Sequence, residues 1–162
     1  MTFCCWWNTK SEKSEKDEIP MLDPKTLPTF IPPVNSGRVI KVYDGDTITI
    51  ASRLNGFSNS QIFKFSVRLN GIDTPEMRTK NADEKEVAII ARDALSSKIL
   101  GNIVILKNVS LEKYGRLLAD IYFEECHLND WMLEQYYAIP YDGGTKQIPV
   151  SWTKYLNTGS LV

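Results

Sequence analysis

The feature that most constrains the fold is a series of short segments, from Gly37 onward, in which apolar and polar residues alternate. Alternation with a period of two is typical of a strand that buries one face. This pattern predicts strands near residues 39–42, 48–50, 62–69, 103–106 and 117–123, and helical spacing predicts helices near 87–99 and 128–137. The remaining segments, 52–60, 70–83 and 138–147, are predicted to be loops.

The order of these segments indicates the fold class. Three strands, a helix, two strands and a second helix do not match the repeating pattern of a parallel α/β sheet. They fit a mostly β, α+β domain: a five-stranded barrel of the OB type with two or three packed helices. Asn81 or Asp83 is predicted to cap the first helix and Gly101 to end it. The C-terminal end is predicted to be irregular, with at most a short helix.

Composition divides the chain near residue 35. Residues 1–35 combine an apolar start, a charged run and most of the prolines, which predicts a flexible N-terminal tail and linker. Residues 36–162 then form one domain, which is long enough for a hydrophobic core. Acidic and basic residues are equally numerous in this domain, so no general basic field attracts a polyanion. Nucleic acid, if bound, must be attracted by local arginines and a metal ion.

Three short motifs contain the residues suited to chemistry. They are DGDT at 44–47, RLNGIDTPE at 68–76 and EKYGR at 112–116. The first is a tight turn between two predicted strands, in which we expect Gly45 to adopt a positive φ. Together the motifs supply several carboxylates and two arginines. Hard carboxylates and paired guanidiniums are what a divalent cation and a phosphodiester require together.

Each motif taken alone also has a purely structural explanation. DGD is common in turns, DTPE is also a helix-entry signal, and KYGR suits a hairpin that needs a glycine. Arg68 alone could be a strand residue paired with an acid on the surface. The occurrence of all three motifs in one chain, in this order and at a spacing that suits a barrel, favours a common site.

In these motifs and their order, from about Arg38 to Tyr141, the chain resembles the staphylococcal nuclease (thermonuclease) family. The resemblance implies the same OB-type barrel. It also implies a Ca²⁺-dependent nuclease, with one divalent ion, that hydrolyses DNA and RNA with low sequence specificity and leaves 3′-phosphate ends. The expected partner is DNA or RNA that is single-stranded or frayed. The long C-terminal helix of the family has no clear counterpart after Tyr141.

The resemblance also assigns roles to the acids. Asp46 and Asp73 would hold the calcium ion together with the backbone carbonyl of Thr74. Asp44 would order the water bound to the ion. Glu76 would lie beside a bound water and act as the general base.

The basic and aromatic residues of the motifs are matched in the same way. Arg68 and Arg116 would bind the substrate phosphate and stabilise the transition state. Lys113 and Tyr114 would contact a neighbouring phosphate. Tyr141 would stack on a base, although a tyrosine at such a position is also commonly a packing residue.

A second hypothesis is a non-catalytic OB-type module that binds nucleic acid or a protein. Domains of this kind have typically lost acids or arginines of the set, whereas this chain has all of them. The balanced charge of the domain favours the module, since it provides little general attraction for a polyanion.

Cysteine usage and the N-terminus indicate an intracellular, cytoplasmic protein, which we expect to be a monomer. Three cysteines do not form a disulfide framework, and MTFCCWW is too short for a signal peptide. No stretch approaches the length of a membrane span. Cys4 and Cys5, followed by two tryptophans, leave open a membrane association through acylation of these cysteines.

Overall fold

The computed structural model describes residues 20–57 and 61–162. The chain divides between Phe30 and Ile31, and the described part of the first unit contains a single turn around residues 24–27. The helices and strands of the described chain all belong to the second unit. The boundary that composition indicates at residue 35 stays a prediction.

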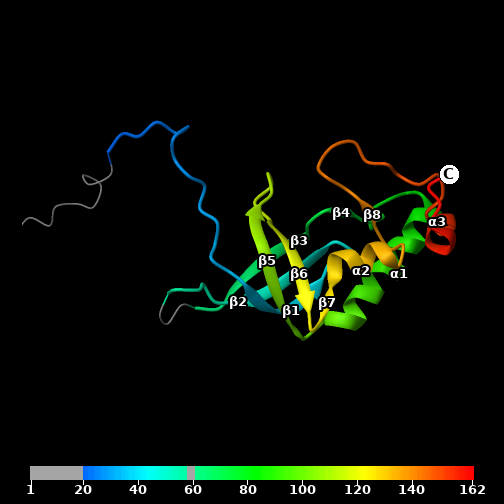
Figure 1. Ribbon diagram of the computed structural model, residues 1–162, viewed down its shortest axis with the longest axis horizontal. Helices are drawn as coiled ribbons and strands as arrows, with labels where there is room; N and C mark the ends of the chain where they lie inside the picture. Colours follow the sequence, from blue (N-terminus) through cyan, green and yellow to red (C-terminus); the bar gives the residue numbers. More distant parts are fainter. Residues whose placement is uncertain (1–19, 58–60) are drawn as a thin grey trace, which may run out of the picture. The chain divides into compact units, whose positions relative to one another are not determined.

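The second unit is built on a closed barrel (Figure 1). Its five strands are β1 (Ser36–Val42), β2 (Thr47–Ser52), β3 (Phe63–Leu69), β5 (Ile103–Leu111) and β6 (Leu117–Phe123). They pair in the order β3-β2-β1-β5-β6, and a parallel pairing between β3 and β6 closes the ring. With three helices added, this confirms the predicted α+β fold of the OB type.

Three two-residue strands complete the sheets. β7 (Cys126–His127) pairs antiparallel with the end of β6, and β4 (Ile72–Asp73) pairs with β8 (Ile139–Pro140). The residues of β4 and β8 were predicted to lie in loops. Their pairing places Asp73 opposite Ile139, and the Tyr141 amide donates to the Gly71 carbonyl at 2.9 Å. This small sheet therefore holds the chain on both sides of Asp73.

The helices are α1 (Ala82–Ile99), α2 (Leu128–Glu134) and α3 (Trp152–Thr158). The first is where the sequence predicts it, and Asn81 caps it by accepting from the amide of Asp83 at 3.0 Å. The second ends before its predicted limit because Tyr136 adopts φ 57°, which an α-helix cannot continue through. Within the described residues, no helix has the length and apolar character needed to cross a membrane.

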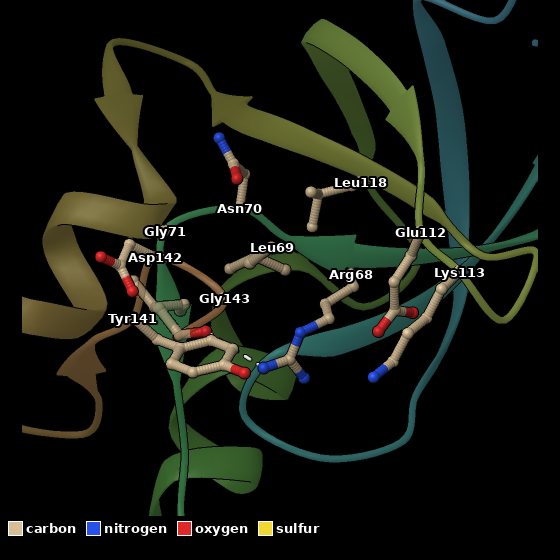
Figure 2. A pocket seen from close by; sticks show the side chains of 11 residues that line it. Arg68, Leu69, Asn70, Gly71, Glu112, Lys113, Leu118, Tyr141, Asp142 and Gly143 are labelled. Carbon is tan, nitrogen blue, oxygen red and sulfur yellow. Dashed lines mark hydrogen bonds between the residues drawn. The ribbon is translucent and has the colours of Figure 1, made fainter. Parts of the chain in front are cut away.

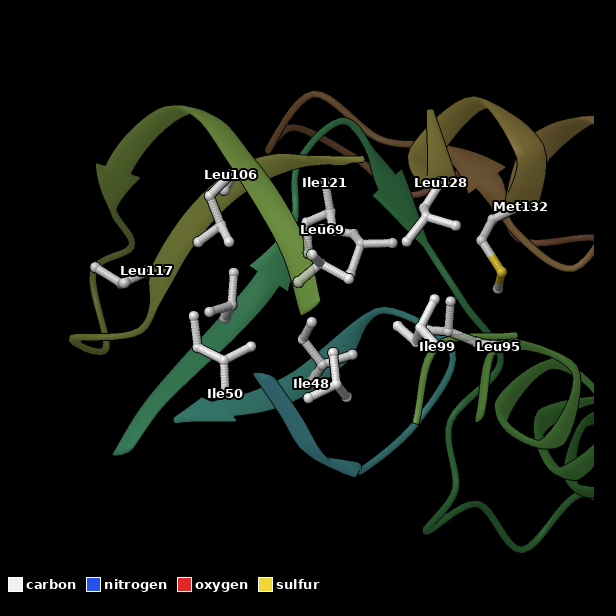
Figure 3. Close-up of a cluster of buried hydrophobic side chains, with 14 of the residues drawn as sticks. Ile48, Ile50, Leu69, Leu95, Ile99, Leu106, Leu117, Ile121, Leu128 and Met132 are labelled. Carbon is white, nitrogen blue, oxygen red and sulfur yellow. The ribbon is translucent and has the colours of Figure 1, made fainter. Parts of the chain in front are cut away.

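The core fills the barrel and extends to α1 and α2 (Figure 3). Inward-facing strand residues such as Ile48, Ile50 and Leu69 are fully buried, and Leu95 from α1 and Met132 from α2 close one side. This alternation is the one that the sequence predicts. Five polar residues are also buried: Asp46, Thr47, Asp73, Thr74 and Asn129. Buried polar groups need hydrogen-bonding or charged partners. All of these residues except Asn129 belong to the DGDT and RLNGIDTPE motifs, so the motif residues are buried together at the candidate site.

Helix α3 is fixed to the start of α1 by Asp83. Its carboxylate accepts hydrogen bonds from Ser151 Oγ at 3.0 Å, from the Trp152 amide at 2.6 Å and from the Thr153 amide at 3.1 Å. An acid at a helix N-terminus satisfies amides that the helix itself leaves free. The segment from β8 to α3 is therefore anchored at both of its ends.

Candidate active site

Asp46 and Asp73, from two different motifs, meet at a single guanidinium. Arg68 Nη1 lies 2.5 Å from Asp46 Oδ2, and Arg68 Nη2 lies 2.9 Å from Asp73 Oδ1. The antiparallel pairing of β2 with β3 places Thr47 opposite Arg68, which brings the turn before β2 to the end of β3. The two carboxylates are 4% and 5% exposed. The strand ends thus converge, and Arg68 faces the acids.

The turn at Gly45 approaches the Thr74 loop very closely. A Cβ atom at Gly45 would lie 2.8 Å from Thr74 Cγ2 and 3.2 Å from Ala91 Cβ. The prediction that Gly45 adopts a positive φ was wrong, because it is not among the glycines with that conformation. Glycine is needed here for space, so that the turn carrying Asp46 can pack against the loop that follows Asp73.

Arg116 reaches the same place from the hairpin between β5 and β6. Its Nε and Nη2 donate to the two carboxylate oxygens of Glu112 at 2.6 and 2.8 Å, and its Nη1 donates to Thr47 Oγ1 at 3.3 Å. Thr47 Oγ1 in turn donates to Asp46 Oδ1 at 2.8 Å. Gly115 has φ 81°, so the hairpin does need this glycine. Hydrogen bonding to Glu112 raises the pKa of Arg116 and holds its side chain in place.

The charges around Asp46 are not fully compensated. Burial raises the pKa of its carboxyl, the charge of Asp44 raises it further, and Arg68 and Thr47 only partly oppose this, so the pKa is about 7. For Arg68, burial lowers the pKa, but the charge of Asp46 and the hydrogen bond to Asp73 outweigh it and the net shift is upward. A further cation near Asp46 would therefore be stabilised.

A cavity of about 250 Å³ opens beside these groups. Its lining residues are Tyr43, Asp44, Asp46, Arg68, Thr74, Pro75, Glu76 and Arg116. Carboxylate and carbonyl oxygens without histidine or cysteine suit Ca²⁺ or Mg²⁺ rather than Zn²⁺. In the described part of the chain, no three His, Cys, Asp or Glu side chains form a metal-binding group by themselves. An ion here would need the Thr74 carbonyl and water in addition to the carboxylates, as the predicted ligand set has it.

Glu76 and Lys146 lie at the exposed side of this site. The Glu76 side chain is 64% exposed, and its amide donates to Glu84 Oε1 at 3.1 Å. Lys146 Nζ is 2.9 Å from Asp73 Oδ2 and 3.6 Å from Glu76 Oε1. Sequence reasoning missed Lys146, which lies in a polar loop without a motif. The sequence-based prediction also gave no role to Glu112 and Thr47, although both residues belong to the three motifs.

A second cavity, of about 320 Å³, also has Arg68 among its lining residues (Figure 2). Tyr141 borders it on one side, and Glu112 and Lys113 border it on the other. Tyr114 is not among its lining residues; this side chain is 73% exposed, with Lys113 Nζ 4.9 Å from the centre of its ring. The structure thus places Lys113 and Tyr141 around one cavity and leaves Tyr114 on the surface beside it.

The sequence around these residues also matches a known protein family. Residues 66–150 match the family described as staphylococcal nuclease homologues. The chain belongs to the staphylococcal nuclease family. The matched segment includes Arg68, Asp73, Glu76 and Arg116, and the β2–β3 pairing brings Asp46 to it from outside the match.

Several curated proteins are similar to the chain. An "uncharacterized endonuclease" of Haemophilus influenzae is 32% identical over 112 residues, which cover 66% of this chain and 53% of the relative. An uncharacterized protein of Bacillus anthracis is 30% identical over 106 residues, or 64% of this chain and 46% of the relative. An "uncharacterized endonuclease" of Escherichia coli is 26% identical over 113 residues, or 64% of this chain and 65% of the relative. The chain therefore spans about half to two thirds of the length of these relatives.

Proposed function

We propose that this member of the staphylococcal nuclease family is a Ca²⁺-dependent nuclease. It would hydrolyse phosphodiester bonds of DNA and RNA with low sequence specificity and leave 3′-phosphate ends. The observation that carries the proposal is the convergence of Asp46 and Asp73 on Arg68, beside a cavity that Arg116 also lines. Membership of the family and the description of two relatives as endonucleases support it.

The acids provide a site that fits a calcium ion. Asp46 and Asp73 would hold the ion together with the Thr74 carbonyl, and Asp44 would orient water around it. The raised pKa of Asp46 supports this assignment, because it reflects burial of the carboxyl and the nearby charge of Asp44, which Arg68 opposes only in part. When bound, the ion supplies charge relief at the phosphate oxygens.

The two arginines would bind the scissile phosphate from either side of the cavity. Arg68 has more N–H donors than its contacts to Asp46, Asp73 and the Ile72 carbonyl use. Arg116 is held in a fixed orientation by Glu112. Charge grows on the phosphorus oxygens as the transition state forms. Guanidiniums that are already oriented stabilise that charge without reorganising.

Glu76 is the group that would accept the proton from the attacking water. Its exposed carboxylate lines the cavity on the side opposite the core. The water oxygen forms a bond to phosphorus, its proton passes to Glu76, and the bond from phosphorus to the 5′ oxygen breaks. The 5′ oxygen takes up a proton from solvent and leaves as a hydroxyl group. The phosphate stays on the 3′ side, and a hydrogen bond from Arg116 stabilises the departing oxygen.

The cavity beside Tyr141 supports a single-stranded or frayed substrate. Leu69 and Leu118 add apolar surface to it, and Lys113 lies at its rim. A base that has left its stack could lie against the tyrosine ring while its phosphate reaches Arg68. A paired base in an intact duplex cannot enter a hollow of this kind without being extruded.

The alternative is a module that binds nucleic acid without cleaving it. One observation favours it: the charges of both arginines are already paired with acids, Arg68 with Asp46 and Asp73, and Arg116 with Glu112. Such pairs could be purely structural. The alternative predicts binding without turnover under any metal condition.

The test is cleavage of fluorescent single-stranded DNA and RNA with Ca²⁺ or with EGTA. We expect cleavage of both polymers with Ca²⁺, loss of cleavage with EGTA, and products that a 3′-phosphatase can dephosphorylate. Folded protein that shows no cleavage, or cleavage that ignores chelation, would defeat the proposal.

We also propose an intracellular, cytoplasmic location. The small number of cysteines supports it. The predicted acylation of Cys4 and Cys5 lies outside the described residues and stays a prediction. Labelling with an alkyne fatty acid tests it: label lost from a variant with both cysteines changed to Ala would support acylation, and unlabelled wild-type protein would contradict it.

A further inference from the structure

The side-chain ammonium of Lys146 lies next to the acids of the site. Lys146 lies in the segment between β8 and α3, which is anchored by the Tyr141–Gly71 hydrogen bond at one end and by Asp83 at the other. Figure 1 shows this segment as the arch that leads into α3. Its two anchors make the approach of Lys146 a property of the fold rather than of a free loop.

The contacts of Lys146 coincide with the groups proposed to serve the metal ion and the attacking water. Asp73 Oδ1 accepts from Arg68, and Asp73 Oδ2 is 2.9 Å from Lys146 Nζ. The same Nζ is 3.6 Å from Glu76 Oε1. Both oxygens of Asp73 therefore face a protein cation, and Lys146 bridges the proposed ligand to the proposed base.

We propose that Lys146 is an internal cation that competes with the divalent ion for Asp73, and so sets the calcium concentration that the enzyme needs. This inference rests on the proposed function, because it takes the ion to bind at Asp46 and Asp73. An ammonium and a divalent ion on the same carboxylate oxygen repel each other strongly in a partly buried site. One of the two must leave when the other binds.

Arg68 differs from Lys146 in this respect. The Arg68 side chain is 14% exposed and contacts both acids, so it belongs to the permanent frame of the site. The Lys146 side chain is 34% exposed and ends a flexible stem. Its Nζ already lies 5.8 Å from the centre of the Tyr141 ring, which offers the displaced ammonium a nearby aromatic surface. Of the two cations that contact Asp73, Lys146 is therefore the one that a metal ion can displace.

Calcium binding to the full chain, measured calorimetrically without nucleic acid, tests the inference. Lys146→Met removes the charge and keeps the length of the side chain, while Lys146→Arg keeps the charge. Lys154→Met is the matched control, since it removes one exposed lysine whose Nζ donates to the Val162 carbonyl instead. We expect Lys146→Met to bind Ca²⁺ roughly tenfold more tightly than wild type. The calcium dissociation constants of Lys146→Arg and Lys154→Met should remain within about twofold of the wild-type value, because neither substitution removes a charge that competes with the ion.

The outcomes separate the two proposals. Equal or weaker calcium binding by Lys146→Met, with wild type binding normally, would overturn the role of Lys146 and leave the metal site intact. No calcium binding by either protein would overturn both. Thermal unfolding with EDTA checks that each variant is folded, and the rise in melting temperature on adding Ca²⁺ should be larger for Lys146→Met than for wild type.

Discussion

Arg68 Nη1 lies 2.5 Å from Asp46 Oδ2, across two strands that pair at Thr47 and Arg68. Both side chains are largely buried, so each is the main compensation for the charge of the other. The pair therefore supports the fold as well as the site. Loss of cleavage in a variant of either residue must be separated from loss of structure.

Replacing Arg68 by Ala should lower both stability and cleavage. Asp46 and Asp73 would lose their shared partner, and removing one member of a buried ion pair lowers the free energy of unfolding by about 3 kcal/mol. Urea denaturation in EDTA measures this. Arg92→Ala is the control, since Arg92 pairs with an exposed Asp93 and should change stability by less than about 1 kcal/mol. Equal effects of the two substitutions would contradict the structural role of Arg68.

Calcium affinity should depend on pH around neutrality. The pKa of Asp46 is raised to about 7, so the carboxyl is protonated below that pH and must lose its proton to bind an ion. Affinity should therefore rise with pH up to about 7, by at most about tenfold per pH unit, and then level off. Calorimetric titrations between pH 5.5 and 8.5 measure it. Asp46→Asn should weaken binding and flatten the profile; an unchanged slope in this variant would assign the proton to another group.

Gly45→Ala should disturb the site through a steric contact. The new methyl group would lie 2.8 Å from Thr74 Cγ2, so the turn and the Thr74 loop must move apart. We expect the free energy of unfolding to fall by roughly 1–3 kcal/mol, together with weaker calcium binding. Adding Thr74→Ser removes the contacting methyl group and should restore part of both. A double variant no better than Gly45→Ala alone would show that the contact is not the cause.

Asp83→Ala should loosen α3 without touching the acids of the site. It removes the carboxylate that accepts from Ser151, Trp152 and Thr153, and loss of a helix cap lowers the free energy of unfolding by about 1–2 kcal/mol. Amide hydrogen exchange should accelerate first in α3. Asp93→Ala, at an exposed position of α1, serves as the control. Unchanged exchange in α3 would mean that its packing against α1 suffices.

The sequence predicted the frame of the molecule because long alternating and helical patterns determine it. β6 occupies the predicted residues 117–123, and α1 contains the predicted periodic residues from Val87 to Ile99. The expectation that two acidic loop tips and Arg68 converge also follows from strand order. β5 continues to Leu111, beyond its predicted end, past a residue with positive φ at Asn108 that no periodicity reveals.

Other features could not be predicted from local pattern. Strands of two residues, such as β4 and β8, have no measurable period. Lys146 is one lysine in a polar loop, and its contact with Asp73 depends on how two distant anchors place that loop. Glu112 did leave a signal, since it precedes Arg116 by four residues in EKYGR and a hairpin brings these two together.

The most direct test of the central claim compares cleavage with binding in Glu76→Gln. The substitution keeps the shape of the side chain and removes its ability to accept a proton. With saturating Ca²⁺, we predict that the cleavage rate for a fluorescent single-stranded oligonucleotide falls by about a hundredfold or more, while the dissociation constant for that oligonucleotide changes by less than about threefold. A cleavage rate equal to that of wild type would contradict the account, because it would place the chemistry outside this site.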